Sequence, residues 1–390
     1  MALQSSPSCL AGLLVSALAL SCAQAPRGDG PAPPDSPALE TRALRARYEA
    51  DPASWPPPAL DPGVEHRELG LAPERAPTAD PVLRAREDLG RLLFFDARLS
   101  GSGQVACASC HDAELGFGDG RASSFGEGFL ALDRNAPSLW NTSLRRAWFW
   151  DGRAATLEEQ ALMVFTNPRE MHTTPEQVVA TLASSRGYRQ TFAEAFSGEG
   201  LTIDTTLRAL TAFEATLVSD RSSDFDRFLL GHHDALTDAA VRGLHLFRTK
   251  ARCIHCHNGP LLTDEGFHNL GLTYYGRELE DLGRYAVTQD PADVGRFRTP
   301  SLRNLGRTGP YMHNGLFELE GVLNMYDAGM PNVVRKPEQA DDPLFPVKSP
   351  LLKPLDLTRE ERADLEAFLA SLTERKRRIR APELPALGDV

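Results

Sequence analysis

The chain has 390 residues, a length that suits two ordinary domains. Apolar residues make up 42% of it, which is enough for a substantial core. The formal net charge of −11 argues against a nucleic-acid partner, because phosphate binding needs a basic surface, but a basic redox partner is compatible with it.

The N-terminus is typical of an export signal. Residues Leu10–Leu20 are almost all small or apolar, a run too short to span a bilayer, and no later run is long enough. The tetrapeptide Ala19-Leu20-Ser21-Cys22 resembles a bacterial lipoprotein box, which would make residues 1–21 a signal peptide and Cys22 a lipid-bearing N-terminus. Simple secretion with cleavage after Ala25 is the alternative. We expect a periplasmic protein, held on a membrane by that lipid.

Residues 22–78 are rich in proline, alanine and charge, which predicts a flexible tether with one short helix near Leu39–Tyr48. Order is expected from about Pro81 onward, and capping boxes and a 3.6-residue apolar period then predict amphipathic helices. Alternating strand patterns are scarce, so the expected fold class is mainly α. The predicted helix starts and helical stripes include Leu89–Phe94, Thr156, Thr174, Leu207–Leu217 and Thr358–Leu372.

Four cysteines beyond the signal form two Cys-x-x-Cys-His units, Cys107–His111 and Cys253–His257. This is the pattern of c-type haem attachment, in which two thiols form thioethers with the haem vinyl groups and the histidine binds the iron. A redox disulfide would not carry a histidine after each pair, and a zinc site would need both pairs close together. We therefore expect two covalently bound haem c groups. Their thiols are Cys107, Cys110, Cys253 and Cys256, and their iron ligands are His111 and His257.

Each haem unit follows a helical segment that ends in phenylalanine, Gly90–Phe95 in one case and Gly243–Phe247 in the other. This weak internal repeat indicates two related haem domains. We place the first at residues 79–235 and the second at residues 236–376, followed by a tail over residues 377–390.

Several further motifs surround the two haem units. They are Arg134–Ser138, Phe149–Arg153, Leu157–Ala161, Glu170-Met171, Arg298–Asn304 and Gly309–Gly315. With these motifs, the chain from Leu89 to about Leu372 resembles the bacterial di-haem cytochrome c peroxidase/MauG superfamily, nearer its MauG-like branch. The resemblance implies a mainly helical fold with two cytochrome c-like haem domains and one calcium ion between the haems.

The resemblance also assigns roles by position. It makes His111 the proximal ligand of a peroxide-reacting haem in the N-terminal domain and His257 that of an electron-transfer haem in the C-terminal domain. Trp150 matches the aromatic residue between the haems, where an indole can relay an electron, with a plain core tryptophan as the alternative. Glu170 matches the acid–base residue over the peroxide site and Gln160 its polar neighbour, with a solvated loop carboxylate as the alternative for Glu170.

Other matched positions concern the haem edges and the cation. Arg298 and His313 match residues near the haem propionates. Asn135, Thr308 and the carbonyl group of Pro310 match calcium contacts, which are hard oxygen donors. The remaining histidines of interest are expected to be structural or exposed: His172, His232, His233, His245, His255 and His268.

The chain departs from the peroxidase pattern at two places. In many of these peroxidases a Gly-His-Gly loop supplies a removable ligand to the reactive haem, whereas here the loop is Gly126-Glu127-Gly128. The distal ligand of the second haem is a methionine in the peroxidases, but the aligned residue here is Tyr326, as in MauG. Met325 and Met330 are the other candidates for that position.

The function implied is that of an exported di-haem peroxidase. It would reduce hydrogen peroxide with electrons from a small redox protein or from an oxidisable partner protein. The alternative function is a non-catalytic di-haem electron-transfer cytochrome, which would not need Glu170 or Gln160. The sequence leaves a homodimer open.

Overall fold

The computed structural model describes residues 37–375 and 379–389, so the signal peptide and Cys22 lie outside the described residues. Thr41–Val390 forms one compact unit, and both Cys-x-x-Cys-His units belong to it. Among the described residues, no helix is both long and apolar enough to cross a lipid bilayer.

The chain is mainly helical, which confirms the predicted fold class. Its helices are α1 (Pro37–Tyr48), α2 (Pro81–Phe95), α3 (Cys107–Cys110), α4 (Leu157–Thr166), α5 (Pro175–Ala183), α6 (Arg186–Ala195), α7 (Ile203–Glu214), α8 (Asp224–Leu229), α9 (Asp238–Arg248), α10 (Tyr285–Thr288), α11 (Leu319–Asp327) and α12 (Arg359–Ser371). Within the described chain the only sheet pairs β1 (Phe267–Asn269) antiparallel with β2 (Arg296–Arg298), so that Phe267 lies opposite Arg298.

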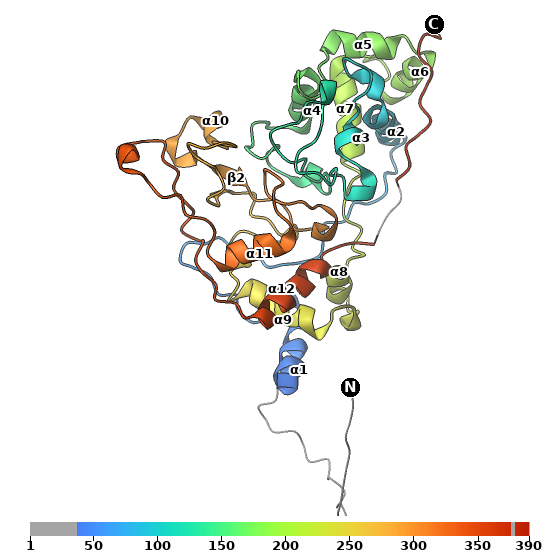
Figure 1. The fold of residues 1–390 in the computed structure, drawn as a ribbon. Coiled ribbons are helices and arrows are strands. Elements are labelled where there is room, and N and C mark those ends of the chain that lie inside the picture. Colours follow the sequence, from blue (N-terminus) through green and yellow to red (C-terminus); the bar gives the residue numbers. More distant parts are fainter. Residues whose placement is uncertain (1–36, 376–378, 390) are drawn as a thin grey trace, which may run out of the picture. The chain divides into compact units, whose positions relative to one another are not determined.

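Two helix pairs of the same design support the two haem units, and in each pair one helix precedes the haem unit in the chain and the other follows it. Helix α2 packs on α7 in one pair, and α9 packs on α12 in the other (Figure 1). A Cβ atom on Gly90 of α2 would lie 1.9 Å from the carbonyl oxygen of Ala209, and one on Gly243 of α9 would lie 1.9 Å from that of Asp364. Only glycine, which has no Cβ, permits such an approach. The weak repeat in the sequence is therefore a repeat of structure.

Two hydrophobic cores surround these pairs. The first is built from residues between Leu89 and Leu217, and the second mainly from residues between Phe225 and Leu372. Helix α8 contributes Phe225 and Phe228 to the second core, so the junction between the cores lies between Leu217 and Phe225. This junction comes earlier in the chain than the boundary expected after residue 235.

Residues 41–78 are packed, which differs from the flexible tether expected for this stretch. Tyr48, Trp55 and Leu69 are buried in the second core. Arg248 of α9 donates a hydrogen bond to the carbonyl oxygen of Pro56 at 2.6 Å. The tether expectation is therefore wrong for residues 41–78, because aromatic side chains among the prolines find a core. The short helix expected near Leu39–Tyr48 is confirmed as α1.

The C-terminal tail returns to the first core. Ile379 and Leu387 pack against that core, and the Asp389 carboxylate accepts a hydrogen bond from the backbone N–H of Arg186 at 2.7 Å. Each end of the compact unit therefore packs on the core of the opposite half. Residues 41–78 precede the first core but pack on the second, and the tail follows the second core but packs on the first.

Candidate haem centres and peroxide site

The first haem unit is arranged to hold an iron ligand. Cys107 and Cys110 lie on the short helix α3, and His111 follows at its end. The Nδ1 atom of His111 lies 2.9 Å from the carbonyl oxygen of Phe117. A carbonyl can only accept, so Nδ1 carries the proton and Nε2 is left as the ligand atom. Burial lowers the pKa of His111, which favours the neutral imidazole that binds a metal.

The second haem unit repeats this arrangement. Cys253 lies in a short 3-10 turn, and the Nδ1 atom of His257 lies 3.1 Å from the carbonyl oxygen of Leu262. Burial also lowers the pKa of His257. Such a hydrogen bond to the second ring nitrogen is how proteins fix the tautomer and the ring orientation of a metal-binding histidine.

Burial raises the pKa of the Cys107, Cys110 and Cys253 thiols, which favours their protonated form. The pKa of Cys110 rises to about 11 and that of Cys253 to about 12. Redox disulfides and zinc sites both depend on a thiolate, which a raised pKa disfavours. The cysteines of the described chain are not joined in disulfides. These residues therefore fit thioether attachment of haem better than either rival.

The first cavity lies over His111 and has a volume of about 890 Å³. His111, Trp150, Gln160 and Glu170 all line it, so the structure brings together the residues that the sequence predicts for a peroxide site. Burial raises the pKa of Glu170, although the charge of Arg153 and a hydrogen bond from Asn167 act against this shift. Glu170 is therefore not a fully solvated loop carboxylate.

The Gly-x-Gly loop is fastened to the backbone of Glu170. The N–H group of Glu127 donates to the carbonyl oxygen of Glu170 at 2.9 Å, and a Cβ atom on Gly126 would lie 2.0 Å from the carbonyl oxygen of Arg169. The Glu127 carboxylate accepts a hydrogen bond from Ser102 at 2.9 Å. Gly126 lines the cavity and Glu127 does not, so this side chain is not directed at the haem site.

The second cavity lies over His257 and is smaller, at about 220 Å³, with mainly apolar walls. Tyr326 of α11 lines it, whereas Met325 and Met330 are not among the described residues that line it. Burial raises the pKa of the Tyr326 phenol, and Cys256 and Cys253 of the haem unit raise it further. The geometry therefore favours Tyr326 over either methionine as the residue facing this haem.

A wall of five residues belongs to both cavities: Asn135, Pro137, Arg145, Trp150 and His313. Trp150 is held there at two points. Its Nε1 donates to the carbonyl oxygen of Asn135 at 2.9 Å, and its own carbonyl oxygen accepts from the N–H of Arg298 at 2.8 Å. His313 stacks on Phe297, with the ring centroids 3.6 Å apart. The indole thus lies between the two haem sites.

The three residues predicted as calcium contacts line the same cavity. Asn135, Thr308 and Pro310 all line the second cavity. The Nδ2 atom of Asn135 donates to the carbonyl oxygen of Arg121 at 2.8 Å, which leaves Oδ1 as the atom that a cation would use. Arg298 lines the second cavity as well, and its side chain is almost fully buried.

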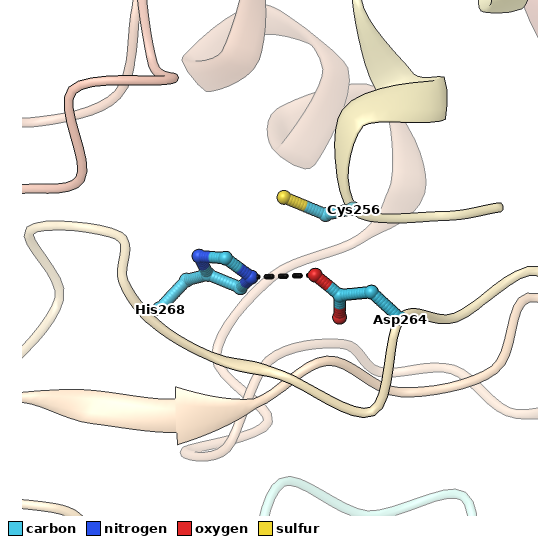
Figure 2. A group of neighbouring side chains, drawn as sticks. All are labelled: Cys256, Asp264 and His268. Carbon is cyan, nitrogen blue, oxygen red and sulfur yellow. Dashed lines mark hydrogen bonds and ion pairs between the residues drawn. The ribbon is translucent and has the colours of Figure 1, made fainter. Parts of the chain in front are cut away.

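A further cluster lies beside the second haem unit, formed by Cys256, Asp264 and His268 (Figure 2). His268 donates from Nε2 to the Asp264 carboxylate at 2.7 Å. The ligand atoms of Cys256, Asp264 and His268 are close enough to one another to hold a metal ion. However, a thioether bond to haem consumes the Cys256 thiolate, so the cluster is better described as a His–Asp pair at the haem edge. His268 lines the second cavity, which the sequence did not predict.

Two charged residues of the cavities were also missed by the sequence analysis. Glu214 on α7 lines the first cavity with 5% of its surface exposed, and its Oε2 atom is buried without a hydrogen-bond partner. Burial raises its pKa to about 8. Arg145 lines both cavities. A signal for Glu214 existed, because it lies on the same helical stripe as Leu207 and Leu210 and is the only acid among them.

The two units, each with a fixed histidine beneath its own cavity, define a di-haem c-type cytochrome. Residues 84–234 match the family model of the di-haem cytochrome c peroxidases. The methylamine utilization protein MauG of Methylorubrum extorquens is 40% identical over 313 residues, which cover 79% of this chain and 84% of that protein. The cytochrome c551 peroxidase of Pseudomonas aeruginosa is 35% identical over 313 residues, covering 78% and 84% respectively.

Among solved structures, a MauG-like protein associated with microbial copper homeostasis is similar with a TM-score of 0.67 and 34% identity, covering 82% of this chain and 93% of that one. The chain belongs to the di-haem cytochrome c peroxidase/MauG family. It is an oxidoreductase of the peroxidase class that binds two c-type haems, and these relatives do not support the alternative of a non-catalytic electron carrier.

Proposed function

We propose that hydrogen peroxide is reduced in the first cavity, over the haem held by His111. The carrying observation is that this cavity contains a buried acid, Glu170, and shares Trp150 with the second cavity. The overall reaction takes up two electrons and two protons per peroxide and releases two water molecules. The bound haem supplies the electron transfer to peroxide, and the chain supplies protons, orientation and an electron path.

Glu170 would move the proton. Its raised pKa lets it take a proton from the oxygen nearer the iron and return it to the departing oxygen, which leaves as water. Gln160 lines the same cavity from α4 and would orient the peroxide by hydrogen bonding. Arg153, which acts on the pKa of Glu170, is itself tied to Asp151 at 3.1 Å and would keep that pKa from rising too far.

Electrons would enter from the second haem through Trp150. Tyr326 is proposed as the distal ligand of that haem. An anionic phenolate stabilises the oxidised iron more than a thioether does, so a tyrosine ligand would lower the reduction potential. The second haem would then suit storage of oxidising equivalents better than storage of an electron. This favours oxidation of a partner protein over routine peroxide scavenging, with a small redox protein as the other electron source.

Tyr326→Phe and Met325→Leu form a matched pair of variants for this ligand. We expect the first to change the absorption and EPR spectra of the low-spin haem and the second to leave both nearly unchanged. Loss of a thioether charge-transfer band in the Met325 variant would show that methionine is the ligand, and a conventional peroxidase would then be the better interpretation.

A calcium ion at Asn135, Thr308 and Pro310 is part of the proposal. These three oxygen donors are of the kind that calcium prefers, and water would complete the shell. Its removal by a chelator should loosen the wall that carries Trp150 and slow electron transfer between the haems. Added calcium should restore the rate, and magnesium should not.

We also propose that the protein works in the periplasm, attached through lipid on Cys22. The motif at Ala19–Cys22 and the proline-rich residues after it support this. Mass spectrometry of the mature N-terminus tests the proposal. A diacylglyceryl group on Cys22 is expected, and an unmodified chain that begins near Pro26 would contradict it.

The test of the peroxide site uses the fully oxidised enzyme. No histidine stands in the Gly126–Gly128 loop, and Glu127 bonds to Ser102, so we expect peroxide to react at once without prior reduction of either haem. Rapid mixing with hydrogen peroxide, followed by absorption spectroscopy, measures this. Reaction only after one-electron reduction would contradict the proposal.

A further inference from the structure

The wall between the cavities contains one permanent charge that no proposed role uses. Of the five residues that line both cavities, only Arg145 is an arginine or lysine. Its Nη2 atom donates to the carbonyl oxygen of Ser138 at 2.6 Å. In the described chain, Arg145 makes no salt bridge with a carboxylate. A guanidinium has five N–H donors, so most of the donors of Arg145 are left for a further partner.

A second arginine lies close to the first. Arg298 of β2 has only 2% of its surface exposed, and its charge acts on Arg145. Arg298 reaches one carboxylate oxygen of Glu265 at 3.4 Å, a long contact, and its Nε atom is buried without a hydrogen-bond partner. Arg298 thus has one long contact with a carboxylate, and no salt bridge is present at Arg145 in the described chain.

The remaining charged or titratable groups around Arg145 do not balance it. They are Glu214 on α7, Glu265 before β1 and His111 after α3. Glu214 has a pKa of about 8 because of burial, so it is largely neutral near pH 7. The guanidinium groups of Arg145 and Arg298 and the single Glu265 carboxylate therefore leave positive charge in excess beside the wall.

An uncompensated charge of this kind is costly. Removing an ion from water without a partner costs several kcal/mol, and proteins avoid it by supplying a counter-ion. Burial and the charge of Arg298 lower the pKa of Arg145 to about 9. The Arg145 guanidinium is still protonated near pH 7, so it carries its positive charge without a carboxylate partner. Arg145 is half-buried and lines both cavities, so an anion on the cavity side of the wall would compensate its charge.

We propose that Arg145 binds a haem carboxylate in the wall between the two cavities and that, with Arg298, it forms one shared anion site for both haems. Each haem carries two propionate groups, which are planar carboxylates that an arginine fork binds in two-point fashion. Arg145 is then a positioning residue that also couples the haems electrostatically. The inference rests on the presence of two haems and not on which of them reacts with peroxide.

The test compares Arg145→Gln with Arg146→Gln in the full chain loaded with haem. Arg146 is adjacent and exposed, and it lines neither cavity, so it is the matched control for loss of one positive charge. The reduction midpoint potential of each haem is measured by spectroelectrochemistry at one pH and one ionic strength. A positive charge near an iron favours its reduced form. We expect both potentials to fall in Arg145→Gln and neither to move in Arg146→Gln.

Three results would overturn the inference: unchanged potentials in Arg145→Gln, a change at one haem only, or an equal change in Arg146→Gln. If Arg145→Gln does not take up two haems, Arg145→Lys replaces it, because the lysine keeps the charge and loses the fork. The propionate bending bands in the resonance Raman spectrum should then shift for both haems. Unshifted bands in a chain with two haems would contradict the inference, whatever its peroxidase activity.

Discussion

The two haem halves share a helix crossing and differ in what faces their cavities. Phe213 and Phe368 stand at matching places, since the Cβ atom of each lies 2.8 Å from a Cβ built on Gly90 or Gly243 respectively. The next residue along the helix is Glu214 in the first half and Leu369 in the second, and both line their cavities. The same scaffold therefore presents a carboxyl group to one haem and an apolar side chain to the other.

This difference extends over the rest of the two cavities. The first is larger and contains Glu170 and Glu214, which can hold or move protons, and Gln160, which can form hydrogen bonds. The second is smaller and has mainly apolar walls, and Tyr326 lines it together with the basic residues Arg298 and His268. The repeated backbone places both haem units in the same way, and we propose that the cavity side chains decide which haem reacts with peroxide.

The largest expected effect comes from removing the proton carrier of the first half. Glu170→Gln keeps the shape of the side chain and loses its acid–base capacity, so we expect peroxide turnover to fall by about 100- to 10,000-fold. The spectrum of the second haem should not change. The control is Glu194→Gln, an exposed acid on α6. Turnover within a few-fold of the unaltered enzyme would remove Glu170 from the mechanism.

The next effect tests whether the two scaffolds are equivalent. A methyl group on Gly90 or Gly243 would collide with backbone carbonyl oxygens, so each alanine variant should lose about 2–3 kcal/mol of unfolding free energy. Gly321 of α11 has open space around it, and Gly321→Ala should instead be neutral or stabilising by up to about 1 kcal/mol. Denaturant unfolding of the haem-loaded chain measures all three. A loss at only one of the two crossings would break the equivalence.

The third effect is smaller and depends on pH. The pKa of Glu214 is about 8 in the folded chain against an ordinary value of 4.5, so the folded state keeps a proton that the unfolded state releases. The unaltered protein therefore loses stability relative to Glu214→Gln as pH rises from about 4.5 to 8, and the difference is constant above that. We expect the glutamine variant to gain stability relative to the unaltered protein at pH 8 and to gain none near pH 4.5. Leu369→Gln should instead destabilise at every pH.

The sequence predicts the parts of this molecule that local pattern determines. The haem units, the capped helices such as α5 and α12, and the paired glycines are readable because each depends on neighbouring residues. The resemblance adds Glu170, Gln160, Trp150 and Tyr326, and the structure groups the first three in one cavity and puts Trp150 in the wall of both.

The remainder depends on contacts between distant segments. The proposed role of Arg145 depends on its closeness to Arg298, which is far along the chain. Nothing in the sequence around either arginine predicts that the two lie close together. His268 faces the second cavity because a two-stranded pairing carries it there. The proline-rich residues 41–78 look like a linker in composition, but Tyr48 and Trp55 are enough to fix them on a core. The composition of a segment shows which side chains it could bury, but it does not show whether another part of the chain offers a core for them.

An EPR spectrum of the fully oxidised protein as isolated tests most directly the claim that one haem is open and the other closed. The claim predicts one high-spin ferric haem, with His111 as its only protein ligand, and one low-spin ferric haem with a protein ligand on each side. The two signals should integrate to equal amounts in a chain that carries two haems. A spectrum with only low-spin signals would contradict the claim, because both irons would then be closed to peroxide.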